Sequence, residues 1–245
     1  MLELKNISFE VEEKKGQKEI IHQLDLSIGD GEFVVVTGPN GGGKSTLAKL
    51  IAGIEKPSSG SIWFDGEDIT EKTITERANL GISFAFQQPV RFKRIHVLDL
   101  IRLAAKKNLS AADACQYLSE VGLCARDYIN REVNASLSGG ELKRIEIATV
   151  LARASRLSVF DEPEAGIDLW SFQNLIEVFE RMRERTKGSI MIISHQERIL
   201  NIADRIVVIA DGAITREGRR EDVLPEIMGT ASAVEACDVY RRTEK

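Results

Sequence analysis

The stretch that decides the fold is FVVVTGPNGGGKST, residues 33–46. Its first five residues form a continuous apolar run, typical of a strand buried on both faces of a parallel sheet. The run that follows matches the pattern GxxxxGKS/T from Gly38 to Ser45, and apolar residues at 47–54 predict a helix directly after it. A strand, a glycine loop and a helix N-terminus in this order form a cradle for phosphate groups. The sequence therefore predicts a nucleotide-binding loop.

Each kind of residue in the predicted loop has an expected role in binding the nucleotide. Glycines let backbone amides turn toward phosphates, and the helix N-terminus adds about half a positive charge there. Lys44 is expected to meet the β- and γ-phosphates of ATP, and the Ser45 hydroxyl to hold Mg²⁺. The residues expected to bind ATP are Gly38, Pro39, Asn40, Gly41, Gly42, Gly43, Lys44, Ser45 and Thr46.

Further apolar segments extend the predicted sheet on both sides of this loop. Residues 2–11 and 19–28 alternate with period two, as half-buried antiparallel strands do, and EEKKGQKE at 12–19 is predicted to be an exposed hairpin turn. Short apolar strands separated by helical patterns are expected at 82–86, 157–160, 189–194 and 205–210. The predicted fold class is α/β, with a mixed, mostly parallel sheet, an antiparallel β portion and an inserted helical subdomain.

The predicted helical subdomain covers residues 90–134, where no strand pattern is evident. Within it, Ser110 and Asp113 have the spacing of a helix cap. Residues 1–89 and 135–245 are expected to form the nucleotide-binding core, so the 245 residues make one domain.

An acidic pair follows one of the buried strands. LSVFDEP places Asp161 and Glu162 at a strand's C-terminal end, where open α/β sheets bind ligands. Asp161 is expected to orient Mg²⁺, and Glu162 to polarise an attacking water. A DE pair after an apolar strand is by itself often only a strand terminus, but its place downstream of the phosphate loop favours catalysis.

LSGGE at 137–141 predicts a second anion-binding helix start. Ser138 is a suitable cap, and Gly139 and Gly140 lie just inside the helix, ahead of Glu141. A plain capped helix explains the segment in isolation. Combined with the phosphate loop, it suggests that a second copy of the protein closes over the γ-phosphate.

Three further polar residues have a structural and a functional interpretation. Gln87 and His195 each follow an apolar strand, so they are either strand-end residues or contacts to Mg²⁺, water and the γ-phosphate. Asp168 in EAGIDL is either a turn residue or part of the site.

Composition and charge exclude some classes of function. A net charge of −5 does not indicate a nucleic-acid footprint or affinity for an anionic membrane surface. Three cysteines without CxxC spacing favour reduced thiols in a cytoplasmic protein. No apolar run approaches the ~18 residues of a membrane span, so no direct membrane insertion is expected.

This ordered set of motifs resembles the ABC-type ATPase family over nearly the whole chain. The resemblance implies ATP and Mg²⁺ as cofactors, hydrolysis to ADP and phosphate, and a transient ATP-dependent homodimer. It also implies that Gln87 is a sensor and Mg²⁺ contact, that His195 is a switch residue, and that Asp168 crosses the dimer interface. Val11 stands where many members stack an aromatic residue on adenine, so no such stacking is expected.

Several tracts are similar to the ATPase of the Suf iron–sulfur cluster assembly system: ERANLGISFAFQQPV, SGGELKRIEI, EAGIDLWSF and HQERIL. The resemblance implies a Suf-type scaffold protein, SufB- or SufD-like, as partner, and it fades after Pro89 at RFKRIHV. The alternatives are the ATPase subunit of a membrane transporter, a non-hydrolytic ATP-gated module, and a chromosome-structure or repair ATPase. The presence of Glu162 and His195 argues against the second, and the lack of a long heptad arm against the third.

Overall fold

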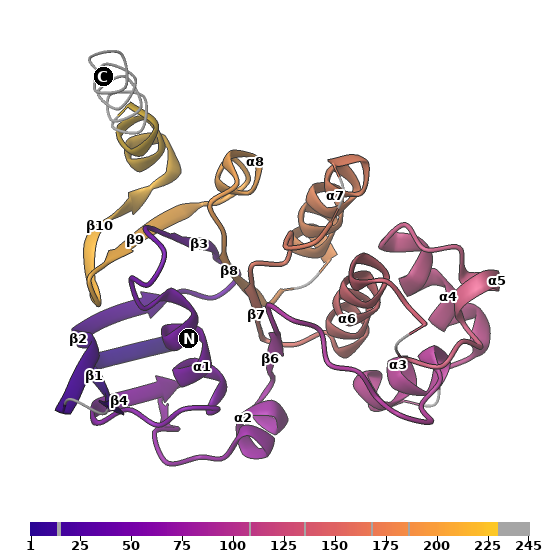
Figure 1. Cartoon of the computed structure of the whole chain (residues 1–245), viewed down its shortest axis with the longest axis horizontal. Helices are drawn as coiled ribbons and strands as arrows, with labels where there is room; N and C mark the ends of the chain where they lie inside the picture. The colour runs from indigo at the N-terminus through magenta and orange to yellow at the C-terminus, as the bar shows by residue number, and fades with distance from the viewer. Residues whose placement is uncertain (14–15, 108, 135, 168, 186, 230–245) are drawn as a thin grey trace.

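The computed structural model describes residues 1–13, 16–107, 109–134, 136–167, 169–185 and 187–229. Its described strands form two sheets (Figure 1). The first sheet is four-stranded and antiparallel, and its strands in the order β2-β1-β4-β5 are Gly16–Ile28, Leu2–Glu13, Ser59–Phe64 and Glu67–Asp68. It is the predicted antiparallel portion.

The second sheet is six-stranded and carries the phosphate loop. In the order β10-β9-β3-β8-β7-β6 its strands are Ala213–Arg219, Arg205–Ala210, Phe33–Thr37, Ser189–Ile193, Leu157–Asp161 and Ile82–Ala85. All neighbours pair in parallel except β10, which returns antiparallel beside β9. The predicted α/β class with a mostly parallel sheet is therefore confirmed.

Helices cover both faces of the six-stranded sheet, which explains the unbroken apolar run of β3. The labelled helices are α1 Lys44–Ala52, α2 Ile74–Leu80, α3 Val97–Ala105, α4 Ala111–Glu120, α5 Ala125–Tyr128, α6 Gly139–Arg153, α7 Leu169–Arg185 and α8 Glu197–Leu200, and residues 220–229 after β10 are also helical. Val34 and Val36 pack into one core with α1 and the four-stranded sheet. Phe33 and Val35 belong to a second core with α6, α7 and α3.

Helices α3, α4 and α5 gather at one end of the molecule, beyond α6 (Figure 1). The predicted cap of α4 is present, since Ser110 and Asp113 form a reciprocal capping box. In the described part of 90–134 the only β pairing is an isolated bridge between His96 and Glu132. The boundaries of the subdomain at 90 and 134 remain a prediction. Across the described ranges, no helix has the length and apolar character needed to cross a membrane.

The front hairpin is longer than the alternating pattern indicates. Pairing of β1 with β2 continues through Glu12–Gln17 to Glu13–Gly16, so most of the predicted turn at 12–19 is strand. Glu12 and Gln17 are exposed. Because backbone pairing needs no apolar side chains, an exposed ladder can extend past the end of the hydrophobic pattern.

A buried arginine joins α2 to the end of α1. Arg77 is 1% exposed, and its guanidinium donates to the carbonyl oxygens of Leu50 (2.6 Å), Ile51 (3.0 Å) and Thr70 (2.9 Å). The Leu50 and Ile51 carbonyls belong to the last turn of α1, where carbonyls lack partners within the helix. That of Leu50 also accepts from the Gly53 N–H at 3.2 Å, so Arg77 supplements the backbone cap. Burial lowers the pKa of Arg77, with Glu71 and Asp68 opposing the shift.

Replacing Arg77 with methionine should lower the free energy of unfolding by about 2–4 kcal/mol, because the carbonyls of Leu50, Ile51 and Thr70 lose the guanidinium donor together. Urea titration followed by circular dichroism measures this, with Arg126→Met as control because Arg126 on α5 is exposed. The control should change stability by less than about 0.5 kcal/mol. Equal stability of the two variants would contradict the bracing role of Arg77.

Candidate functional site

The phosphate loop turns tightly between β3 and α1, and three of its glycines, Gly38, Gly41 and Gly43, have a positive φ that other residues rarely adopt. Gly38 has φ +128°, and a Cβ there would lie 2.0 Å from the Ile209 carbonyl oxygen on β9. Gly43 has φ +100° and precedes α1 as its N-cap, without a side-chain cap hydrogen bond. The first amides of α1 therefore remain available to an anion, as the sequence pattern predicts.

Lys44 lies beneath this loop rather than in solvent. It is 5% exposed, and its Nζ donates to the carbonyl oxygens of Gly38 and Pro39, both at 2.8 Å. Burial lowers the pKa of Lys44, while the charges of Glu162 and Asp161 act in the opposite direction. The loop thus holds its one cation at the centre of the turn.

Ser45 and Asp161 meet at the carboxyl edge of the sheet. The Ser45 hydroxyl donates to Asp161 Oδ1 at 3.0 Å, which joins the start of α1 to the end of β7. Asp161 is 3% exposed, and burial raises its pKa, although the bond from Ser45 acts to lower it. A hydroxyl and a carboxylate side by side are oxygen donors of the kind that Mg²⁺ takes, so the pair fits this cation.

Glu162 lies between two polar side chains, Gln87 and His195. Gln87 Nε2 donates to its Oε2 at 2.6 Å, and His195 Nε2 lies 3.3 Å from its Oε1. Because a carboxylate only accepts, the contact needs the hydrogen on His195 Nε2. Glu162 has φ +44°, and its N–H donates to the Ile193 carbonyl oxygen at 3.0 Å. The neighbouring strands β6, β7 and β8 therefore deliver Gln87, Glu162 and His195 to one place.

The LSGGE segment forms the capped helix start that the sequence predicts. Ser138 accepts from the Glu141 N–H at 3.3 Å, and its own N–H donates to Glu141 Oε2 at 2.6 Å. Glu141 is also bonded by the Tyr128 hydroxyl, which raises the pKa of Tyr128 and lowers that of Glu141. A Cβ on Gly139 would meet nothing within 4 Å. This helix start is open to a partner.

Within one copy, the described residues divide into two groups. The loop 38–46, Gln87, Asp161, Glu162 and His195 lie at one sheet edge, while no hydrogen bond or ion pair described for the chain joins 138–141 to the loop. Asp168 lies outside the described residues. Val11 lies on β1 opposite Lys18.

Sequence reasoning missed a set of buried charged residues behind this site. Glu164 Oε1 accepts from the hydroxyl of the fully buried Ser194 at 2.5 Å, and burial raises the pKa of Glu164. Lys143 and Glu146 of α6 lie below Phe86 and Gln87. The only sequence signal for the second pair is its i,i+3 spacing within a helix rich in buried apolar residues.

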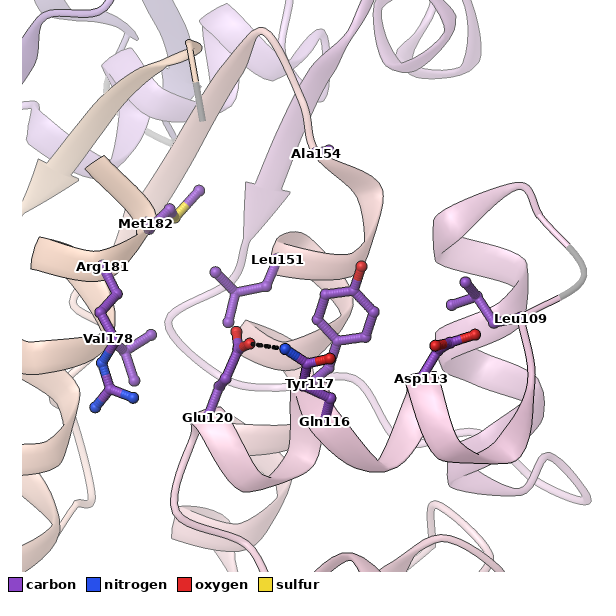
Figure 2. Close-up of a pocket in the computed structure, with 10 residues that line it drawn as sticks. All are labelled: Leu109, Asp113, Gln116, Tyr117, Glu120, Leu151, Ala154, Val178, Arg181 and Met182. Carbon is purple, nitrogen blue, oxygen red and sulfur yellow. Dashed lines mark hydrogen bonds between the residues drawn. The ribbon is translucent and has the colours of Figure 1, made fainter. Parts of the chain in front are cut away.

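A cavity of about 400 Å³ lies away from these groups, between α4, the end of α6 and α7 (Figure 2). Apolar and charged side chains share its wall, and on α4 Gln116 Nε2 donates to Glu120 Oε1 at 3.3 Å. None of the residues predicted to bind ATP lines it.

Comparison with known proteins agrees with this geometry. The family model described as ABC transporter matches residues 21–165. An uncharacterized ABC transporter ATP-binding protein, MJ0035 of Methanocaldococcus jannaschii, is 38% identical over 218 residues, covering 85% of this chain and 86% of that protein. The spermidine/putrescine import ATP-binding protein PotA of Mesoplasma florum is 32% identical over 232 residues, covering 92% of this chain and 63% of that protein.

Among solved structures, the dimeric post-hydrolysis state of the ATP-binding cassette MJ0796, bound to ADP and Pi, superposes with a TM-score of 0.81. It is 24% identical, and the match covers 90% of this chain and 99% of that one. The chain belongs to the ATP-binding proteins of the ABC transporter family and is an ABC-type ATPase.

The burial of Asp161 predicts a conflict between stability and function. Its folded-state pKa is raised above the ordinary 3.8, so the carboxylate destabilises the fold increasingly as pH rises through the folded pKa. Asp161→Asn keeps an acceptor for Ser45 and removes the charge. It should raise the Tm of the nucleotide-free protein in EDTA. For a chain of this size, each kcal/mol gained in the free energy of unfolding raises the Tm by about 2–4 °C.

Thermal melts at about pH 4, near the ordinary pKa, and at about pH 8 check this, since the gain should be larger at the higher pH. A gain that does not grow with pH, or a lower Tm at both, would contradict the assignment of a buried, charged Asp161.

Proposed function

We propose that the chain is the ATP-hydrolysing subunit of an ABC transporter, in which two copies close on ATP and a separate membrane subunit receives the motion. The observation that supports this best is an apolar groove beside Gln87, described below. The names of the relatives point the same way, because PotA is named for spermidine and putrescine import.

In the proposed reaction ATP supplies the γ-phosphoryl group, and Lys44 with the loop amides binds the phosphates. Ser45 and Asp161 would hold Mg²⁺, which would supply positive charge to neutralise the phosphates. Glu162 takes the proton of the attacking water as the water oxygen bonds to the γ-phosphorus and ADP leaves. Gln87 and His195 orient Glu162 through the contacts at 2.6 and 3.3 Å.

The second copy completes the proposed site. Each chain presents its loop 38–46 and its helix start at Ser138, but one copy does not bring the two together. A head-to-tail pair would place Ser138, Gly139 and Gly140 of one copy against the phosphates bound by the other, and Asp168 would lie at that interface. Free amides at the start of α6 suit such an anion contact.

The apolar groove, here called the Phe86 groove, lies between α2 with β6 and α3 with α6. It consists of two adjoining hollows of about 230 and 160 Å³, which share Phe84, Phe86 and Thr149. The remaining lining is mostly apolar, and Ile74 and Val90 are 52% and 45% exposed. An apolar surface of this kind is suited to an amphipathic segment of a partner.

The groove adjoins the catalytic group directly. Phe86 precedes Gln87, whose side chain bonds Glu162. A partner segment that moves Phe86 therefore acts one residue away from the proposed sensor. We assign the groove to a short segment of the membrane subunit.

An iron–sulfur scaffold remains a second candidate partner. It is favoured by the Suf-like tracts, and one of them, ISFAFQQPV at 82–90, includes groove residues. The relatives described above are named for ABC transport, so the transporter subunit is the stronger proposal.

Glu162→Gln should retain ATP binding yet reduce hydrolysis at least about a hundredfold, because the amide cannot take the proton from water. Lys44→Ala should instead lose ATP binding, since the loop then lacks its cation. Calorimetric titration of ATP and phosphate-release kinetics separate the two effects. Turnover by Glu162→Gln at the wild-type rate would remove Glu162 from this role.

Ile74→Glu should lower recovery of the partner at least about tenfold, because a charge is placed in the Phe86 groove. Leu103→Glu is the matched control, since Leu103 is 66% exposed on α3 and does not line either hollow. The measurement is a tagged pull-down from cytosol and membrane fractions of the native cell, with partners identified by mass spectrometry.

A polytopic membrane protein that is recovered with Leu103→Glu and lost with Ile74→Glu would support the transporter proposal. Loss of a non-membrane scaffold together with iron or sulfide would replace it with the iron–sulfur proposal. Equal recovery by both variants would remove the groove from partner binding.

A further inference from the structure

Helix α6 buries an ion pair beneath the residues that follow β6. Lys143 and Glu146 lie one turn apart, with side chains 1% and 14% exposed, and Lys143 Nζ is 3.5 Å from Glu146 Oε2. Burial lowers the pKa of Lys143 and raises that of Glu146, while their mutual attraction opposes both shifts. Keeping both groups charged at this depth is costly unless they have further partners.

Those further partners are the backbone atoms of Phe86 and Gln87. Lys143 Nζ donates to the carbonyl oxygen of Phe86 and lies 3.3 Å from that of Gln87. Glu146 Oε1 accepts from the Phe86 N–H at 2.9 Å. Because β6 ends at Ala85, these groups have left the sheet ladder and need other partners. The ion pair supplies them from α6.

We propose that Lys143 and Glu146 are a positioning pair for ATP hydrolysis, which fixes the backbone of Phe86 and Gln87 so that the Gln87 amide reaches Glu162. The inference rests on the roles proposed above for Gln87 and Glu162. It adds a mechanical link, since α6 is capped by Ser138, which is proposed to contact the nucleotide bound by the second copy. Contact at one site then shifts α6, and α6 carries Gln87 with it at the other.

The geometry distinguishes this role from simple stabilisation. A buried ion pair is often replaced by neutral side chains of similar size with no loss of stability. Glutamine in place of Glu146 still offers an acceptor to the Phe86 N–H, whereas methionine in place of Lys143 offers the carbonyls no donor. The double variant Lys143→Met with Glu146→Gln therefore removes the donor to the Phe86 and Gln87 carbonyls, keeps an acceptor for the Phe86 N–H and leaves no unpaired charge.

The test is steady-state ATP hydrolysis by the full-length chain, with thermal melts of every variant. The Met/Gln double variant should fold with a Tm within about 5 °C of wild type and show kcat lowered about tenfold, with KM for ATP changed less than about twofold. A Gln/Gln double variant restores a donor at position 143, so its kcat should be at least about threefold higher than that of the Met/Gln variant.

Two controls complete the experiment. Arg205→Met with Glu32→Gln removes an ion pair of 2.7 Å at the opposite edge of the sheet, and it should leave kcat unchanged. In a Gln87→Ala background the Met/Gln pair should add no further loss of kcat, because both changes remove the same contact.

Wild-type kcat in a folded Met/Gln variant would overturn the proposal. So would a combined variant whose fold-loss of kcat equals the product of the losses caused by Met/Gln and by Gln87→Ala separately. If the Met/Gln variant does not fold, the Gln/Gln variant carries the same epistasis test with Gln87→Ala. Wild-type turnover by Gln87→Ala would also overturn it, without bearing on which partner occupies the Phe86 groove.

Discussion

Parallel pairing of β3, β8, β7 and β6 is the constraint on which the rest of the site depends. It places the carboxyl ends of four strands along one edge, and each strand delivers its next residues there. The Ser45–Asp161 hydrogen bond at 3.0 Å and the two contacts to Glu162 follow from that alignment. The same edge buries the charged groups of Asp161 and Lys44, and this burial raises the pKa of Asp161 and lowers that of Lys44.

Much of this arrangement could be predicted from local patterns. FVVVT needs two covered faces, and GPNGGGKST needs glycines because Gly38 lies against the β9 backbone. The cap of α6 could be predicted because a serine and a glutamate at this spacing satisfy each other's backbone. Residues after strands of a parallel sheet must also converge, which brings Gln87, Glu162 and His195 together.

Other features have no local signal. Strands β4, β5 and β10 were not predicted, and the burial pattern of β4 and β10 shows mostly exposed or half-buried side chains. Lys143 and Glu146 resemble ordinary helix surface residues in sequence, and only the packing of α6 against β6 buries them. The Phe86 groove is built from six separate stretches of the chain, so its shape depends on how α1, α2, β6, α3 and α6 pack together. Such long-range packing does not follow from sequence periodicity.

The central claim is that two copies share each ATP site, and mixing two inactive variants tests it most directly. Lys44→Ala keeps the helix start at Ser138, and Ser138→Arg keeps the loop, so only a mixed pair contains one complete site. The account predicts that each variant alone is inactive and that an equal mixture recovers up to about a quarter of the wild-type rate. A mixture of folded variants that never exceeds the sum of their separate rates, at any ratio or concentration, would contradict it.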